Sequence, residues 1–138
     1  MSHLHDALAA SSLRRVIIES PCSGDMTGHA GYLARCLRDS IQRAEAPIAS
    51  HGLFAFSMVL DDDKVADRNA GMYAGWAWIE VTEAVVVYDD LGITEGMKRA
   101  ILLAEHIGKP VEYRSLNSRA NIVTGHIPGT DQSARSPY

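Results

Sequence analysis

The apolar residues of the chain gather in short runs that polar residues bound on both sides. Val16, Ile17 and Ile18 form one such run, and Val85, Val86 and Val87 form the core of another. Short runs of this kind, rich in β-branched residues, are typical of buried strands. The pattern predicts strands over Arg15–Glu19, Glu83–Asp89 and Pro110–Arg114, and a further strand that runs into a loop over Pro47–Phe56.

Between these runs the apolar residues recur three or four positions apart, which is the spacing of one helix face. This spacing predicts helices over residues 32–46, 69–80 and 94–107, while the polar residues 57–69 predict an irregular excursion. Strands that alternate with helices imply βαβ units, right-handed crossovers and a parallel sheet. We therefore expect an α/β fold: a small three-layer sandwich with four or five parallel strands, and a ligand crevice at their carboxyl ends.

Length and charge narrow the class of protein. The 138 residues suit one domain, and 46% apolar with 22% charged residues is an ordinary globular composition. The net charge of −4 provides no basic surface for nucleic acid, so we expect no polymeric nucleic acid partner. We also expect no membrane partner and a cytoplasmic location, because no apolar run approaches the ~18 residues of a membrane span and the first residues lack a signal-peptide core.

Polar residues follow three of the predicted strands, at the edge where a parallel sheet presents its ligand site. Hydroxyl and carboxylate groups suit the hydroxyls of a sugar, and free backbone N–H groups suit a phosphate. Serine, glycine and aspartate are also ordinary turn and cap residues, so each of these residues alone has a structural explanation. The set comprises Ser20, Cys22, Ser23, Gly24 and Asp25 after the first strand, Ser50 and His51 after the second, and Asp89, Asp90, Gly92, Thr94 and Glu95 after the third.

Common cofactor motifs are missing from the sequence. There is no G-x-x-x-x-G-K-[ST] and no G-x-G-x-x-G, and the histidines are too scattered for a zinc site. The run Asp61–Asp63 lacks the spacing and the distal glutamate of an EF-hand. We expect neither a cofactor nor a bound metal.

Three stretches together carry a resemblance to a known family: "RVIIESPCSGD", "PIASHGLFA" and "DRNAGMYAGWAWIEVTEAVVVYDDLGITEGMKRAILLAEHIGKPVEYR". Over residues 14–114 the chain resembles the nucleoside 2-deoxyribosyltransferase-like superfamily, and in particular its small phage and bacterial branch. Residues 1–13 then form an N-terminal extension, and residues 115–138 an extended C-terminal tail. The resemblance implies a flavodoxin-like or Rossmann-like sheet in a homodimer or larger homo-oligomer, whose active sites a neighbouring subunit completes.

Active members of that superfamily cleave the bond between base and sugar, as deoxyribosyltransferases or nucleoside 5'-monophosphate N-glycosidases. The resemblance therefore implies a nucleoside or nucleotide as the ligand. By the family's pattern the pocket would be lined by Ser20, Ser23, Gly24, Asp25 and Tyr32, with His51, Asp67, Arg68, Trp76, Asp89, Thr94 and Gly96 as further candidates.

One position departs from that pattern. Relatives carry their nucleophilic glutamate in the helix after the third of these strands, and an ungapped count back from Lys109 puts Ala100 at that position. Asp89, Asp90 or Glu95 could take the catalytic role, although turn, cap and helix-dipole chemistry also explain these acids. Three hypotheses stay open: an N-glycosidase or deoxyribosyltransferase, a non-catalytic protein that binds or sequesters a nucleotide, and an assembly protein with a vestigial pocket.

Overall fold

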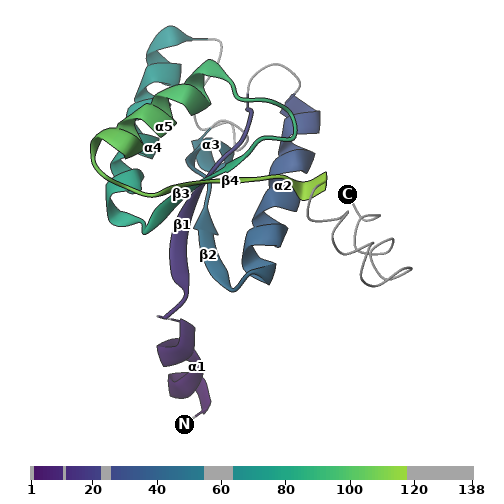
Figure 1. Cartoon of the computed structure of the whole chain (residues 1–138), viewed down its shortest axis with the longest axis vertical. Helices are drawn as coiled ribbons and strands as arrows, with labels where there is room; N and C mark the ends of the chain where they lie inside the picture. The colour runs from purple at the N-terminus through teal and green to yellow at the C-terminus, as the bar shows by residue number, and fades with distance from the viewer. Residues whose placement is uncertain (1, 11, 23–25, 55–63, 118–138) are drawn as a thin grey trace.

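The computed structural model describes residues 2–10, 12–22, 26–54 and 64–117 (Figure 1). Its centre is a four-stranded parallel sheet with the strand order β2-β1-β3-β4. Helices cover both faces, which confirms the expected α/β sandwich of flavodoxin-like, Rossmann-like type. The strands are β1 (Arg14–Glu19), β2 (Glu45–Ile48), β3 (Ala84–Tyr88) and β4 (Val111–Arg114).

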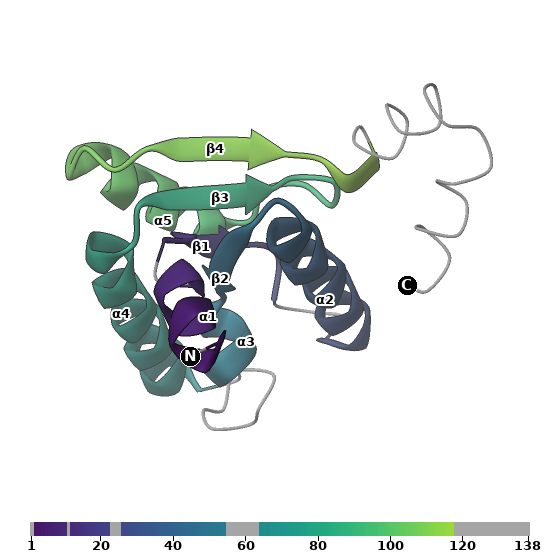
Figure 2. The ribbon, with the colours of Figure 1, turned by 90° about the horizontal axis from the view of Figure 1, so that it is seen from below.

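The helices divide between the two faces of the sheet, as Figure 2 shows from below. One face carries α2, and the other carries α4 and α5, while α1 projects from the start of β1 (Figure 1). Short α3 follows β2 and packs against α4. The bounds are α1 Ser2–Ala10, α2 Met26–Gln42, α3 Ser50–Phe54, α4 Val65–Val81 and α5 Glu95–His106.

Alternation along β1 and β3 builds a separate core on each face, because successive side chains of a strand point to opposite sides. Val16 and Ile18 of β1 face α2, where they pack with Leu33 and Cys36 in a buried cluster. The other cluster lies under α4 and α5 and contains Ile17, Ile79, Val85, Val87, Met97, Ala100, Ile101 and Ala104. The continuous apolar runs of the sequence therefore mark strands that are buried on both faces.

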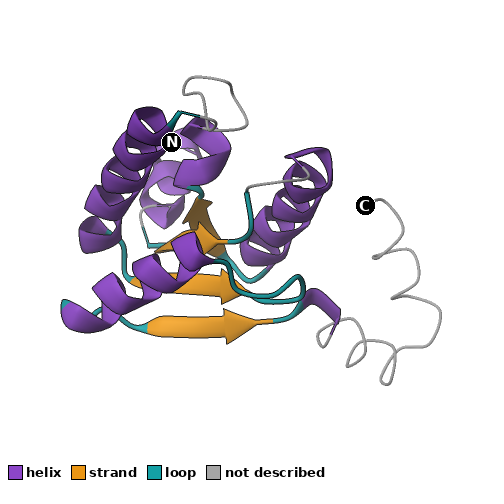
Figure 3. Ribbon diagram, turned by 90° about the horizontal axis from the view of Figure 1, so that it is seen from above, coloured by secondary structure: helices purple, strands orange, loops and turns teal. Residues whose placement is uncertain are grey.

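The strand order fixes where a ligand can reach the sheet. The chain leaves β1 toward β2 on one side, and β3 then pairs with β1 on its other side. Connections that diverge in this way leave a crevice at the carboxyl ends of β1 and β3, which is the usual ligand position in open α/β sheets. Figure 3 shows helices on both sides of the strands.

The predicted helix over residues 32–46 was wrong at both ends. α2 runs from Met26 to Gln42, so it both begins and ends earlier than predicted. After α2 the chain turns through Ala44, whose φ of 61° is left-handed, and enters β2. Pro47 therefore lies inside β2 instead of ending a helix, and β2 tolerates it because it is an edge strand.

Two further boundaries differ from the sequence prediction. The apolar run after Ile48 leaves the strand and forms α3, so His51 lies on a helix. α4 begins at Val65, earlier than the predicted start at Asn69, and this places Asp67 in its first turn. The triple aspartate and the C-terminal residues 118–138 lie outside the described residues.

Candidate functional site

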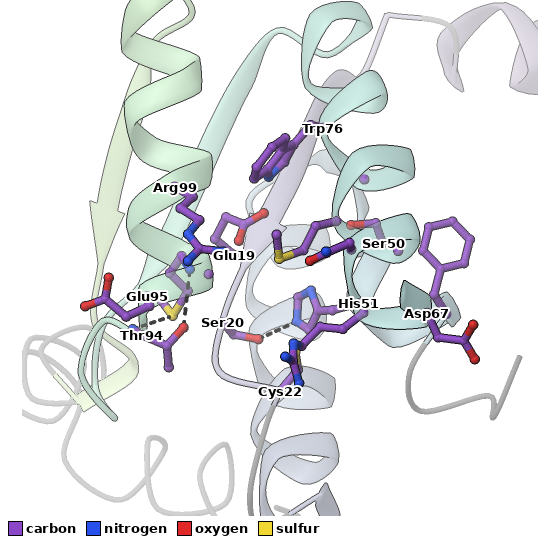
Figure 4. A pocket seen from close by; sticks show the side chains of 18 residues that line it. Glu19, Ser20, Cys22, Ser50, His51, Asp67, Trp76, Thr94, Glu95 and Arg99 are labelled. Atoms are coloured by element: carbon purple, nitrogen blue, oxygen red, sulfur yellow. Dashed lines mark hydrogen bonds between the residues drawn. The ribbon is translucent and has the colours of Figure 1, made fainter. Parts of the chain in front are cut away.

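A cavity of about 560 Å³ opens at the carboxyl edge of the sheet, bounded by the end of β1, by α3 and α4, and by the start of α5 (Figure 4). It lies at the crevice between β1 and β3 that the strand order creates. Its polar lining residues are Glu19, Ser20, Cys22, Ser50, His51, Asp67, Arg68, Asn69, Thr94, Glu95 and Arg99. Its other lining residues are Phe54, Gly71, Met72, Gly75, Trp76, Gly96 and Met97.

Glu19 is the last residue of β1 and reaches the cavity on the face that α4 and α5 cover. It shares this face with Ile17 because the two residues are two positions apart on the strand. Within the described part of the chain its carboxyl group has no hydrogen-bond or ion-pair partner. The side chain is half-buried, and its partial removal from water raises the pKa of Glu19 to about 8. At neutral pH the group is therefore predominantly a protonated carboxylic acid.

Ser20 and His51 form a hydrogen-bonded pair at the floor of the cavity. Ser20 Oγ lies 2.8 Å from His51 Nε2, and Ser20 is buried. Burial, together with the charge of His29, lowers the pKa of His51 to about 4. The imidazole is therefore neutral at pH 7 and has one donor and one acceptor nitrogen, of which Nε2 meets Ser20 Oγ.

Thr94 begins the wall that α5 contributes. Its Oγ1 accepts a hydrogen bond of 3.3 Å from the backbone N–H of Met97, which caps the helix. The neighbouring Glu95 is exposed and forms an ion pair of 3.2 Å with Lys98. A helix N-terminus of this kind favours a negatively charged ligand group, although the carboxylate of Glu95 opposes it.

The opposite wall belongs to α4, whose first turns contribute Asp67, Arg68 and Asn69 and whose middle contributes an apolar surface. The Trp76 indole packs partly against the core under α4 and α5, and its remaining surface faces the cavity (Figure 4). Tyr73 meets this indole edge to face, with ring centroids 5.5 Å apart. Met72 adds a flexible thioether to the same lining. The cavity thus sets an aromatic surface opposite hydroxyl, imidazole and carboxyl groups.

Many of the residues selected from the sequence meet at this cavity. Glu95 is the only one of the three catalytic candidates among them. The selected residues that line it are Ser20, Cys22, Ser50, His51, Asp67, Arg68, Trp76, Thr94, Glu95 and Gly96. Ser23, Gly24 and Asp25 lie outside the described residues.

Tyr32, Asp89 and Asp90 are not in the cavity lining. Asp89 is exposed. Asp90 accepts a hydrogen bond of 2.6 Å from Tyr32 Oη, on the face that α2 covers. Asp90 also accepts hydrogen bonds from the Ser115 hydroxyl and from the backbone N–H groups of Leu116 and Asn117. Its position therefore fits a tether for the end of β4.

Ala100 faces the core and not the cavity. It is 1% exposed and packs with Ile17 and Ile101 under α5. Sequence reasoning missed Glu19, which supplies a carboxyl group to the cavity. The available signal was strand alternation, since a glutamate two positions after a buried isoleucine points to the same covered face.

Comparison with known families gives a single assignment. Residues 14–114 match the domain of unknown function DUF7768. The chain belongs to this family. No curated protein and no solved structure matches the chain.

Two further observations concern metals and membranes. The described ranges contain no group of three or more histidine, cysteine, aspartate or glutamate side chains arranged to hold a metal ion. Among the same residues no helix combines the length and the apolar character that crossing a membrane requires.

Proposed function

We propose that this protein binds a nucleoside or nucleotide in the cavity at the carboxyl edge of the sheet. The observation that carries the proposal is the pairing of the Trp76 indole with the Ser20–His51 pair across one cavity at the crevice between β1 and β3. Its volume of about 560 Å³ lies within the range of ordinary small-molecule sites. The resemblance to nucleoside 2-deoxyribosyltransferase-like proteins supports the same class of ligand.

The two walls match the two parts of such a ligand. A flat heterocyclic base gains about 1–3 kcal/mol by stacking on an aromatic side chain, and Trp76 offers that surface. Sugar hydroxyls both donate and accept hydrogen bonds, and Ser20, His51 and Thr94 supply both kinds of partner. The mixed lining is less suited to a wholly apolar ligand, which could not use the remaining hydrogen-bonding capacity of these polar groups.

The alanine at position 100 favours binding of the ligand without turnover. This side chain packs in the core and has no group that could attack an anomeric carbon. Cleavage of an N-glycosidic bond is the second candidate, because Glu95 brings a carboxylate to the rim of the cavity. The resemblance and the composition further lead us to propose that the protein is a homo-oligomer in the cytoplasm. Light scattering on the pure protein tests the oligomeric state.

A ligand panel separates these functions. We would incubate the pure protein with nucleosides, deoxynucleotides and cyclic nucleotides, and measure the melting temperature and the free base released. A ligand at 100 times its Kd should stabilise the fold by roughly 2.7 kcal/mol without base release. Base release that is lost in Glu95→Ala would establish the enzyme instead. No shift and no release across the panel would leave the assembly hypothesis ahead.

A pair of tryptophans on α4 provides a matched control. Trp76 lines the cavity, whereas Trp78 is 47% exposed and is not part of the lining. Trp76→Leu should weaken ligand binding by about ten-fold or more, from the loss of stacking, as measured by titration calorimetry. Trp78→Leu should leave the affinity unchanged. Equal effects of the two substitutions would contradict a ligand seated against Trp76.

A further inference from the structure

Glu19 carries a carboxyl group that takes part in none of the contacts described above. It is the last residue of β1, beside the crevice between β1 and β3, and it lines the cavity together with Trp76 (Figure 4). Its strand neighbour on the same face is Ile17, which belongs to the core under α4 and α5. No hydrogen bond or ion pair within the described ranges engages its carboxyl oxygens.

A carboxyl group in such a place is unusual. Burying an ionised carboxylate without a cation or a hydrogen-bond donor is very costly, so such groups normally take up a proton. The cavity does carry a cation, because Arg99 of α5 lines it, but Arg99 is exposed and forms no ion pair with Glu19 in the described structure. The other titratable or charged lining groups are Cys22, His51, Asp67, Arg68 and Glu95.

We propose that Glu19 is the base-recognition group of the cavity: as a neutral carboxylic acid it donates a hydrogen bond to a ring nitrogen or carbonyl oxygen of a nucleobase stacked on Trp76. This inference rests on the proposed function and deepens it, since it assigns the base to the β1 end of the site. It also selects against a ligand that would present an anionic group there. A protonated carboxyl group held in an apolar site to donate a hydrogen bond is an established chemical device.

The pKa of Glu19 sets the pH range of the effect. Burial raises it to about 8, so a ligand that requires the acid form should bind roughly 30-fold more weakly at pH 9.5 than at pH 6.5. Adenosine and cytidine are suitable probes because neither titrates between these two values. The imidazole of His51 stays neutral throughout, since its pKa lies near 4. The thiol of Cys22 is the one lining group with an ordinary pKa inside this range.

Three variants isolate the carboxyl group. Glu19→Gln keeps the size and an N–H donor, so it should bind within a few-fold of wild type at pH 6.5 and show no loss at pH 9.5. Glu19→Leu keeps the bulk but removes the donor, and should lose at least ten-fold in affinity at both pH values. Cys22→Ser should retain the roughly 30-fold loss. These affinities are measured by titration calorimetry with adenosine and cytidine.

A measurement on the ligand-free protein supports the same test. The folded-state pKa of Glu19 is raised above its unfolded value, so its contribution to stability is full below about pH 4.5 and is lost as the pH rises to about 8. The melting temperature of wild type should therefore fall relative to Glu19→Gln between pH 5 and pH 8. A carbon-13 titration of the Glu19 carboxyl group should have its midpoint well above 4.5.

The outcomes separate the two proposals. Wild-type binding with equal affinity at both pH values, or a Glu19 midpoint near 4.5, overturns the inference and leaves the proposed function intact. A pH dependence that survives in Glu19→Gln overturns it as well. If wild-type protein binds no nucleoside or nucleotide of the panel at either pH, the proposed function falls, and this inference falls with it.

Discussion

Asp89 and Asp90 are consecutive carboxylates at the end of β3, yet their surroundings differ. Asp89 is exposed, whereas Asp90 collects hydrogen bonds from Tyr32, Ser115 and the backbone that follows β4. Burial acts to raise the pKa of Asp90, but these hydrogen bonds outweigh it and the pKa lies below its ordinary value. Asp90 therefore stabilises the fold as an anion.

The pair provides a residue-scale prediction. Asp90→Ala leaves the Tyr32 hydroxyl and two backbone N–H groups without their acceptor, and should reduce the free energy of unfolding by about 1–3 kcal/mol. Asp89→Ala should change it by less than about 0.5 kcal/mol. Urea denaturation measures both. Because the folded-state pKa of Asp90 is depressed, the difference between wild type and Asp90→Ala should shrink as the pH falls below about 4.

Equal losses in the two variants would contradict a tether at Asp90. A difference that persists unchanged at pH 3 would show that the shape of the side chain matters and its charge does not. Neither result is expected, because the hydrogen bonds to Asp90 are between 2.6 and 3.1 Å long.

The same residues show how much of the candidate site could be predicted from the sequence. It predicted the sheet edge where Ser20, His51 and Thr94 line one cavity, because apolar runs and the turns after them are local signals. It could not separate Asp89 from Asp90, since their roles depend on α2 and β4, which are distant in sequence. Glu19 was overlooked because a polar residue at the end of a strand resembles an ordinary boundary.

At the scale of elements, α3 and α4 pack closely at one glycine. A Cβ atom added to Gly75 would lie 3.1 Å from the Cβ of Ser50 and still closer to its hydroxyl. This contact lets α3 lie against α4, and so holds His51 beside the cavity. The sequence pattern does not predict this contact, because a glycine inside a predicted helix indicates only a weak helix former.

Two glycine substitutions test this packing. Gly75→Ala gains up to about 1 kcal/mol of helix propensity but crowds Ser50, at a cost of about 1–3 kcal/mol, so we expect a net loss of stability. Gly31→Ala on α2 meets nothing within 4 Å and should raise stability by about 0.5–1 kcal/mol. Melting temperatures measure both. The double variant Ser50→Gly with Gly75→Ala should recover part of the loss, and a failure to do so would contradict the contact.

Across the whole molecule, an ion-pair network joins the two outer strands of the sheet. Arg114 of β4 donates two hydrogen bonds, of 2.7 and 2.8 Å, to the carboxylate of Glu45 on β2. Arg14 of β1 and Glu112 of β4 extend the network, and Ser40 of α2 donates to Glu45. The side chains of Arg114 and Glu45 are only 8% and 6% exposed, so water screens this pair weakly.

Removing one partner from this buried network should reduce the free energy of unfolding far more than removing one partner of a surface ion pair. Arg114→Met leaves the buried Glu45 carboxylate short of its main partner, and should cost about 3–5 kcal/mol of unfolding free energy. The control is Arg15→Met, which removes an exposed ion pair with Glu83 and should cost at most about 1 kcal/mol. Adding Glu45→Gln to Arg114→Met should restore part of the loss, because no unpaired charge stays buried. Denaturant unfolding measures all three variants, and equal losses in the Arg114 and Arg15 variants would contradict a buried network between the outer strands.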